Sequence, residues 1–233
     1  MTPSKLPDQL QLTIVIAAAG CGDRFGADKM SERLGDRTVL ETTVAALRTA
    51  IPATPVVVVV ASDTLDDWRA ILESDSPKTV VIAGGPRRQD SVRLGVERAV
   101  EWGAELVAVH DGARPLIHSE DVKAVVGVMG DASAAILCAR VCDTVKRIGG
   151  EGLICETLDR DHLRLALTPQ VFRVAALESA WQRQDLSREW SDEAALIEAD
   201  GRLVRCATAE HPNPKITTAA DLEFVRMICG DGS

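Results

Sequence analysis

The sequence predicts an α/β protein with a wound, mostly parallel central sheet. Short β-branched runs alternate along the chain with longer helical patterns, and the runs show no alternation of polar and apolar residues. Such runs suit strands that are covered on both faces. Repetition of strand, helix and strand predicts right-handed crossovers between parallel strands. The strand candidates are Leu12–Ala17, Val56–Ala61, Thr79–Ala83, Leu106–Val109 and Ala134–Ala139.

Helix candidates lie between and after these runs. In the first part of the chain they are Thr38–Ala50, Asp63–Glu73, Asp90–Trp102 and Ser119–Met129. Ser119 is a suitable N-cap for the last of them, and Asp90 is interpreted as a cap of its own helix.

The strand–helix rhythm stops after Ala139. Val141–Ile148 and Leu153–Thr157 read as two strands, and the sequence Gly-Gly-Glu-Gly at 149–152 predicts the hairpin loop between them. A hairpin inserted in a wound sheet often projects outward. We therefore expect an arm at about 141–160.

Regular structure resumes towards the C-terminus. The patterns predict helices over 174–184 and 192–200, a strand over 203–208, and a last helix that begins with a capping box at Thr218 and Asp221. The chain has no internal repeat and no low-complexity linker. The simplest division is a single domain, residues 1–233, with a projecting arm.

Composition narrows the classes of function. The chain has 233 residues, 46% of them hydrophobic and 26% charged, which is ordinary for a folded globular protein. The net charge of −9 gives no general attraction for nucleic acids or anionic membranes, so an anionic ligand needs a local basic cluster. No apolar run reaches the length of a membrane span, and the N-terminus lacks the pattern of a signal peptide. We expect a cytoplasmic protein.

The cysteines show no metal-binding spacing. They are Cys21, Cys138, Cys142, Cys155, Cys206 and Cys229, with no CxxC pair among them. We interpret them as reduced and mostly buried thiols.

A glycine-rich loop follows the first predicted strand. It reads AAAGCGDRFGADK over residues 17–29 and contains Arg24 and Lys29. The dinucleotide fingerprint GxGxxG needs glycine where Phe25 stands, and the P-loop motif GxxxxGK[ST] is absent. The loop suits a triphosphate whose charge must be neutralised. On its own it is also compatible with a plain turn that carries solvated basic residues.

Two further polar clusters follow strands, where ligands bind in wound sheets. The first, GGPRRQDS over 84–91, offers Arg87 and Arg88 to a phosphate. The second, VHDGARP over 109–115, offers Asp111 to a hydroxyl-bearing substrate or magnesium and Arg114 to a phosphate. Asp111 and Arg114 could also form an ion pair that only stiffens the loop. His110 is interpreted as structural, because no nucleophile stands near it in the sequence.

Later polar segments carry weaker signals. The segments 143–147, 157–160 and 167–170 would each be solvated on their own, and Lys215 stands in a short extended stretch between prolines and threonines.

Taken in order, these segments resemble the 2-C-methyl-D-erythritol 4-phosphate cytidylyltransferases. The matching pieces are AAAGCGDRFGADK, GGPRRQDSV, VHDGARP, DTVKR, LTPQVF, SDEAALIEADG and PKITTAADL. They run over nearly the whole chain. The resemblance implies a Rossmann-like nucleotidyltransferase fold and a homodimer in which each arm reaches the partner's active site. It also implies a reaction of CTP with a polyol phosphate that needs Mg²⁺, bound mainly through the CTP phosphates.

The resemblance also implies roles for individual residues. Arg24, Lys29 and Lys215 match positions that stabilise the reacting triphosphate. The positions that match contacts to the nucleotide are Ala18, Ala19, Gly20, Gly85 and Ser91. The positions that match the polyol phosphate side are Asp111, Arg114, Thr144, Arg160 and Thr168, of which Thr144 and Arg160 belong to the neighbouring subunit's arm.

Two departures from the family pattern bear on the phosphate and base sites. Asp28 stands where relatives usually have proline, and an acidic neighbour would weaken phosphate binding at Lys29 unless it points away. Pro86 stands where an acidic residue often lies in the base-binding loop. Three alternatives stay open: a ribitol 5-phosphate cytidylyltransferase, a catalytically inactive nucleotide-binding homologue, and a nicotinamide-dependent oxidoreductase suggested by the wound sheet alone.

Overall fold

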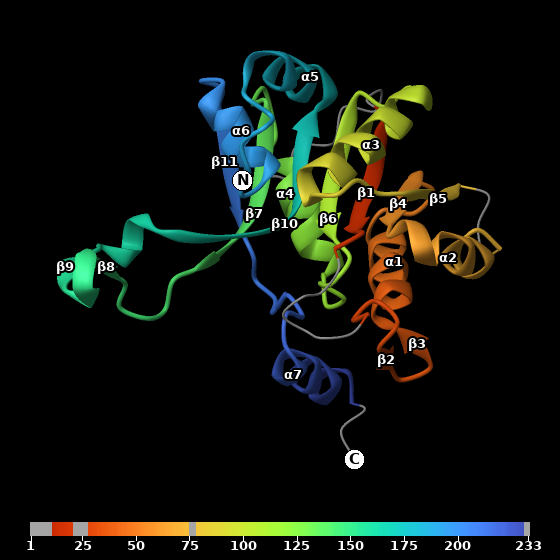
Figure 1. Cartoon of the computed structure of the whole chain (residues 1–233), viewed down its shortest axis with the longest axis horizontal. Coiled ribbons are helices and arrows are strands. Elements are labelled where there is room, and N and C mark those ends of the chain that lie inside the picture. The colour runs from red at the N-terminus through yellow and green to blue at the C-terminus, as the bar shows by residue number, and fades with distance from the viewer. Residues whose placement is uncertain (1–10, 21–27, 75–77, 231–233) are drawn as a thin grey trace.

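The computed structural model describes residues 11–20, 28–74 and 78–230. Its centre is a seven-stranded sheet in the order β11-β7-β10-β6-β1-β4-β5 (Figure 1). The strands are β1 (Leu12–Ala18), β4 (Val56–Val60), β5 (Thr79–Ala83), β6 (Leu106–Asp111), β7 (Ala134–Arg140), β10 (Arg164–Arg173) and β11 (Val204–Thr208). Strand β10 pairs antiparallel with both of its neighbours, and the other pairings in the sheet are parallel. The prediction of a wound, mostly parallel sheet is confirmed.

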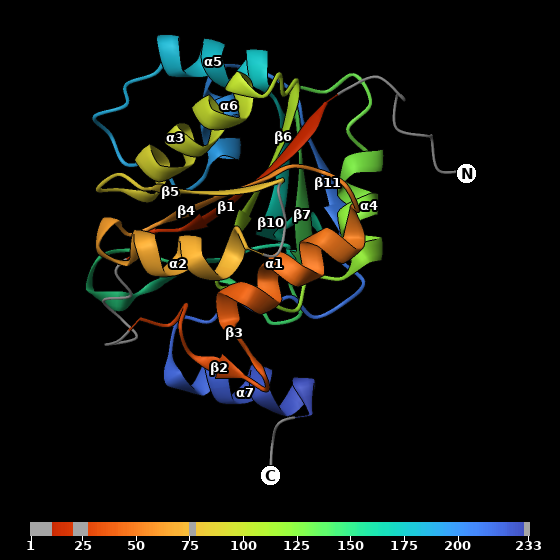
Figure 2. The ribbon, with the colours of Figure 1, turned by 90° about the vertical axis from the view of Figure 1, so that its right-hand side faces the viewer.

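Helices cover both faces of this sheet, so the body has three layers (Figure 2). One layer contains α3 (Arg88–Glu101), α5 (Val174–Arg183) and α6 (Glu193–Ala199). The opposite layer contains α1 (Val39–Ala50), α2 (Leu65–Leu72) and α4 (Ser119–Gly127). The last helix, α7 (Ala219–Cys229), lies next to a small hairpin of β2 (Arg33–Leu34) and β3 (Arg37–Thr38). Short 3₁₀ turns occur at Ser62–Thr64, Gly150–Gly152 and Arg160–His162.

Each central strand contributes side chains to two hydrophobic cores, one on each face of the sheet. The run of five valines that forms β4 is completely buried, with Val56, Val58 and Val60 in one core and Val57 and Val59 in the other. Successive side chains of a strand point to opposite faces, so a sheet covered twice needs apolar residues at every position. This physical requirement is why the apolar runs of the sequence identify the strands.

Strand β10 is absent from the sequence prediction. The first three residues of the segment are exposed and Pro169 lies in its second half, and proline argues against a central strand because it donates no ladder hydrogen bond. The structure accommodates Pro169 at an irregularity, where the register with β7 shifts between Ala166 and Gln170. The small β2–β3 hairpin was not predicted either.

The predicted arm is a real hairpin. Strands β8 (Lys146–Ile148) and β9 (Ile154–Thr157) pair antiparallel and project from the body of the molecule (Figure 1). Every residue of both strands is exposed. The first strand begins at Lys146 rather than at Val141, so the arm starts as an extended leg without ladder pairing.

Several local predictions need correction. The N-cap of α4 is His118, whose Nδ1 accepts a hydrogen bond from Glu120 N at 3.3 Å, and Ser119 is the first helical residue. Asp90 does help to cap α3, as predicted, but from the third helical position of a capping box: its carboxylate accepts from the backbone and side chain of Arg87, which is the N-cap residue. The capping box of Thr218 and Asp221 is confirmed.

The cysteines are less buried than predicted. Cys138 on β7 is buried, but Cys142, Cys155, Cys206 and Cys229 are exposed, because they lie on the arm, on the edge strand β11 and at the end of α7. Cys21 lies outside the described residues. None of the helices in the described ranges combines the length and apolar character of a membrane span.

Candidate active site

Three loops converge at the carboxyl ends of β1, β5 and β6. A Cβ atom added to Gly84 would come within 2.4 Å of Ala19 Cβ, and one added to Gly112 would come within 3.0 Å of Ala18 Cβ. Glycine at these positions is therefore what allows the loops after β5 and β6 to approach the end of β1. The predicted nucleotide-side residues Ala18 and Ala19 lie at this junction.

The predicted residues Gly85 and Ser91 form one hydrogen-bonded unit. Gly85 N donates to Ser91 Oγ at 3.1 Å, and the hydroxyl lies within donor distance of Arg87 O, also at 3.1 Å. Ser91 is buried, so its hydroxyl fixes the shape of the loop. Gly20 is exposed at the end of the first described segment.

Asp111 stands at the centre of a cationic cluster. Its Oδ2 atom lies 3.0 Å from Lys215 Nζ and 3.4 Å from Arg114 Nε, and its Oδ1 atom lies 3.2 Å from Arg88 Nε. The predicted pairing of Asp111 with Arg114 is present. This ion pair is one contact in a larger network, so it does more than stiffen the loop.

The network sets the charge of Asp111. Burial by itself would raise the pKa of this carboxyl, but the charges of Arg88, Lys215 and Arg114 outweigh that effect and hold the pKa below its ordinary range. Asp111 is therefore ionised at neutral pH. It can anchor a lysine and an arginine that both face the same space.

Arg88 links this cluster to helix α6. Its Nη1 atom lies 2.9 Å from Glu193 Oε2, and the Glu193 side chain is 4% exposed. Burial raises the pKa of Glu193, against the opposing charge of Arg88. Arg88 is thus committed to two carboxylates, whereas the sequence suggested that it faces a phosphate.

Arg87 has a structural role as well. Its guanidinium donates to both carboxylate oxygens of Asp90 and to the carbonyl oxygens of Leu186 and Ser187. These bonds join the loop after β5 to the loop before α6.

His110 and Thr168 support Asp111 from behind. His110 Nε2 lies 3.1 Å from Arg114 O, and Nδ1 lies 3.1 Å from Thr168 Oγ1. Thr168 Oγ1 also accepts a hydrogen bond from Asp111 N at 3.1 Å. Burial lowers the pKa of His110 to about 4, so the ring is neutral and both of its nitrogens are used. The interpretation of His110 as a structural residue fits this geometry.

A proline-bounded segment carries Lys215 to the cluster. Asn213 Nδ2 donates to Thr168 O, Arg114 Nη1 donates to Asn213 O, and both distances are 2.8 Å. Ile216 N donates to Ala113 O at 2.9 Å. Two flanking residues are therefore fixed to the loop after β6. Lys215 itself is one-third exposed, so its ammonium contacts Asp111 and also faces the solvent side.

These groups border a cavity of about 160 Å³. Its lining residues are Arg88, Asp111, Arg114, Ala166, Leu167, Thr168, Gln170, Ser191, Asp192 and Lys215. Gln170 Oε1 is a buried acceptor for which the described part of the chain supplies no hydrogen-bond partner. A lysine, an arginine and an unpaired acceptor around one cavity suit a ligand with phosphate and hydroxyl groups.

Other predicted residues lie apart from this cavity. Thr144 and Arg160 are on the arm, exposed, and Arg160 donates to Cys142 O across the two legs of the arm. Arg24 lies outside the described residues. Lys29 is half-buried, just before the turn into β2.

The unusual Asp28 is engaged in this turn. Its Oδ1 atom accepts from Met30 N at 3.0 Å, and its Oδ2 atom accepts from Ser31 Oγ at 2.6 Å. The carboxylate is thus bound to the residues that follow Lys29. Both of its oxygens therefore face local donors within this turn.

Comparison with known proteins identifies the family. The family model for 2-C-methyl-D-erythritol 4-phosphate cytidylyltransferase matches residues 12–230. The chain belongs to this family. The family resemblance and the prediction of a nucleotidyltransferase enzyme are confirmed.

Curated members of the cytidylyltransferase family match along most of the chain. The enzyme named 2-C-methyl-D-erythritol 4-phosphate cytidylyltransferase from Pelotomaculum thermopropionicum is 36% identical over 94% of this chain and 94% of its own length. A bifunctional enzyme IspD/IspF from Rhodospirillum rubrum is 36% identical over 95% of this chain. The chain spans 58% of the length of that bifunctional relative.

Solved structures of the same family share the fold. The 4-diphosphocytidyl-2C-methyl-D-erythritol synthase from Anaerococcus prevotii has a TM-score of 0.85 at 26% identity and covers 97% of this chain and 99% of its own. The 2-C-methyl-D-erythritol 4-phosphate cytidylyltransferase from Thermus thermophilus has a TM-score of 0.75 at 30% identity, with coverage of 95% and 100%.

The sequence interpretation missed three residues of this site. Glu193 stood within a quoted motif without a role of its own, Asn213 lay in the proline-bounded stretch before Lys215, and Gln170 was part of a segment without a role. Glu193 carries a usable signal, an acidic residue in the first turn of a short apolar helix. Its partner Arg88 stands 105 residues earlier, so no local pattern identifies the pair.

Proposed function

We propose that this chain transfers the cytidylyl group of CTP to 2-C-methyl-D-erythritol 4-phosphate. The observation that carries the proposal is the cluster of Asp111, Arg114 and Lys215 around one cavity at the carboxyl edge of the sheet, in a chain of this family. The products are 4-diphosphocytidyl-2-C-methyl-D-erythritol and pyrophosphate.

The reaction needs no covalent intermediate with the protein. A phosphate oxygen of the polyol phosphate forms a bond to the α-phosphorus of CTP, and the bond from that phosphorus to the bridging oxygen of pyrophosphate breaks. The protein contributes position and positive charge. In this proposal Arg24, Lys29 and Lys215 stabilise the charge on the reacting phosphorus and the leaving group, and the loops at Ala18, Ala19, Gly20, Gly85 and Ser91 hold the nucleotide.

The polyol phosphate would occupy the cavity beside Asp111. Asp111 accepts a hydrogen bond from a hydroxyl group, and Arg114 and Thr168 hold the surrounding loops and face the phosphate side. This division of roles is supported by the pairing of Arg114 with Asp111 and by the bond from Asp111 N to Thr168.

Magnesium enters the proposal as an ion carried by the CTP phosphates. Asp111 is the one acid that contacts Lys215 in the described part of the site, and both of its oxygens already contact basic groups. That donor set fits an ion that keeps its water and phosphate ligands, not a cage built from protein groups. When bound, the ion neutralises triphosphate charge.

We also propose a cytoplasmic homodimer in which the arm completes the neighbouring site. Large apolar side chains on and beside the arm are strongly exposed, with Ile148, Leu153 and Ile154 each about two-thirds accessible. Exposed apolar residues on a two-stranded hairpin favour a partner surface. Thr144 and Arg160 of the partner subunit would then bind the polyol phosphate.

The test is release of pyrophosphate from CTP in the presence of Mg²⁺. Parallel reactions contain methylerythritol phosphate or ribitol 5-phosphate, and a Lys215→Ala variant serves as the inactive control. Turnover with the first substrate alone supports the proposal. Turnover with ribitol 5-phosphate alone would identify the chain as a ribitol 5-phosphate cytidylyltransferase. CTP binding without turnover in either reaction would identify an inactive homologue. NAD(P) binding in place of CTP would support the oxidoreductase alternative.

A further inference from the structure

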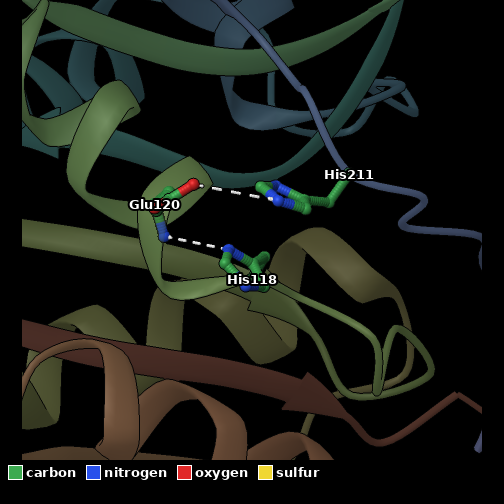
Figure 3. A group of neighbouring side chains, drawn as sticks. All are labelled: His118, Glu120 and His211. Atoms are coloured by element: carbon green, nitrogen blue, oxygen red, sulfur yellow. Dashed lines mark hydrogen bonds and ion pairs between the residues drawn. The ribbon is translucent and has the colours of Figure 1, made fainter.

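A second polar cluster lies outside the cavity. His118, Glu120 and His211 lie together, and one possible ligand atom from each lies within 4.8 Å of the other two (Figure 3). His118 and Glu120 begin helix α4, and His211 belongs to the segment that leads to Lys215. The two imidazole rings stack with their centroids 3.7 Å apart.

The hydrogen bonds indicate which nitrogen of each ring keeps a lone pair. His211 Nδ1 lies 3.3 Å from Asp121 Oδ2, so this nitrogen carries the proton and Nε2 keeps its lone pair. His211 Nε2 in turn lies 3.8 Å from Glu120 Oε2. His118 Nδ1 accepts from Glu120 N at 3.3 Å as the cap of α4, so this nitrogen keeps the lone pair and would bind a cation in place of that hydrogen bond.

Asp121 provides the supporting carboxylate that histidine ligands commonly have. It is 1% exposed, and its two oxygens accept from Glu210 N at 3.0 Å and from His211 N at 3.3 Å. A buried carboxylate on the far nitrogen fixes the ring and raises its basicity.

We propose that His118, Glu120 and His211 bind one transition-metal cation, with Zn²⁺ the fitting class. Two imidazoles and one carboxylate are a common ligand set for zinc with an open position for water. The side chains are open to solvent, with Glu120 75% and His211 33% exposed, so an ion can enter without rearrangement of the core. Binding needs side-chain rotations that open the stack of the two rings, because imidazole lone pairs lie in the ring planes and metal–ligand distances are near 2 Å.

Such an ion would join α4 to the segment 209–215. That segment also carries Asn213, which is bonded to Thr168 and Arg114, and Lys215. The bound cation would therefore stiffen the segment 209–215, which positions Lys215, at a point outside the cavity.

The test uses Co²⁺ as a spectroscopic probe with the full-length protein. We expect one Co²⁺ per chain with visible d–d bands of nitrogen and oxygen ligands and without the near-ultraviolet thiolate band that cysteine ligands produce. Titration with Zn²⁺ should displace the cobalt spectrum and raise Tm.

Three variants separate a real site from surface binding. His118→Ala and Glu120→Gln, both at exposed positions, should weaken Co²⁺ binding at least tenfold, and Asp121→Asn should weaken it about tenfold through loss of the supporting carboxylate. His162→Ala is the matched control, because His162 is an exposed histidine that also contacts a carboxylate, Asp159 at 3.1 Å, outside the cluster. It should bind Co²⁺ as the parent does.

Two results would overturn the inference. One is a cobalt spectrum dominated by the thiolate band, which would assign the metal to cysteines such as the exposed Cys142 or Cys206. The other is the lack of a specific site, seen as binding that His118→Ala and His162→Ala weaken equally or as no binding at micromolar metal. Circular dichroism of each variant confirms that the fold is retained.

Discussion

The cluster around Asp111 and the arm at β8–β9 are built in opposite ways. Asp111, Arg114 and Thr168 are buried and joined to each other through side chains and backbone, with partners drawn from three distant parts of the chain. The arm residues are exposed, and their ion pair between Arg147 and Glu156 lies on the surface. The Asp111 half of the proposed site is therefore pre-organised within the subunit, whereas the arm half needs a partner surface to become ordered in its binding position.

Lys215 should be the most sensitive position in the buried half. Lys215→Ala removes a charge that contacts Asp111 and faces the cavity, and we expect kcat to fall about 100- to 1,000-fold with a smaller change in KM. Steady-state kinetics with both substrates measure the split. An unchanged kcat would remove Lys215 from the catalytic residues and would contradict the catalytic role assigned to the buried cluster around Asp111.

The stability of the buried half should depend on Glu193. Glu193→Gln leaves Arg88 with Asp111 as its one remaining carboxylate, and because Arg88 is partly exposed we expect a loss of about 2 to 3 kcal/mol in the free energy of unfolding. Urea denaturation measures it. Glu97→Gln is the matched control, because the Arg93–Glu97 pair is about half exposed on both sides and should contribute less than about 0.5 kcal/mol. Equal losses in both variants would contradict the network.

The arm should affect substrate binding without affecting stability. Arg160→Ala should raise KM for the polyol phosphate roughly tenfold to a hundredfold through loss of a charged hydrogen bond, with little change in KM for CTP. The unfolding free energy should stay within about 0.5 kcal/mol of the parent value, as for other surface substitutions. Equal effects on the two substrates would place Arg160 in another role.

His110 should make the buried half sensitive to acid. The ring stays neutral in the fold because its pKa is about 4, whereas in the unfolded chain it binds a proton near the ordinary value of 6.5. The unfolded state then binds more protons as pH falls through this window, so stability declines by about 1 to 2 kcal/mol between pH 6.5 and 5. Histidine NMR, which does not require a variant, should show His110 uncharged down to pH 5. A ring that protonates near 6.5 would contradict this assignment.

Local chemistry explains which features could be predicted from the sequence. The valines of β4 predict a strand because a sheet covered on both faces needs apolar residues at every position. The glycine-rich segment 149–152 predicts the hairpin turn. The same reasoning fails for β10, where Pro169 suggests a loop and only tertiary pairing with β6 and β7 makes a strand.

The site follows the same division. Asp111 and Arg114 were found because they follow a strand and stand three residues apart. Glu193 and Asn213 were missed because their partners, Arg88 and Thr168, are distant in the sequence. The prediction that the cysteines are mostly buried was wrong for the same reason, because Cys142 and Cys155 lie on the arm, where they are exposed within one subunit.

The most direct test of a shared active site is complementation between two impaired subunits, measured at a polyol phosphate concentration well below the KM of the Arg160→Ala variant. Co-expressed Arg160→Ala and Lys215→Ala chains form heterodimers in which one site combines an intact body with an intact arm. If the arm acts on the neighbouring subunit, purified heterodimers of this symmetric pair should recover about half of the parent activity. Activity no higher than that of the separate variants would show that each site is completed within one subunit, and would contradict the proposed role of the arm.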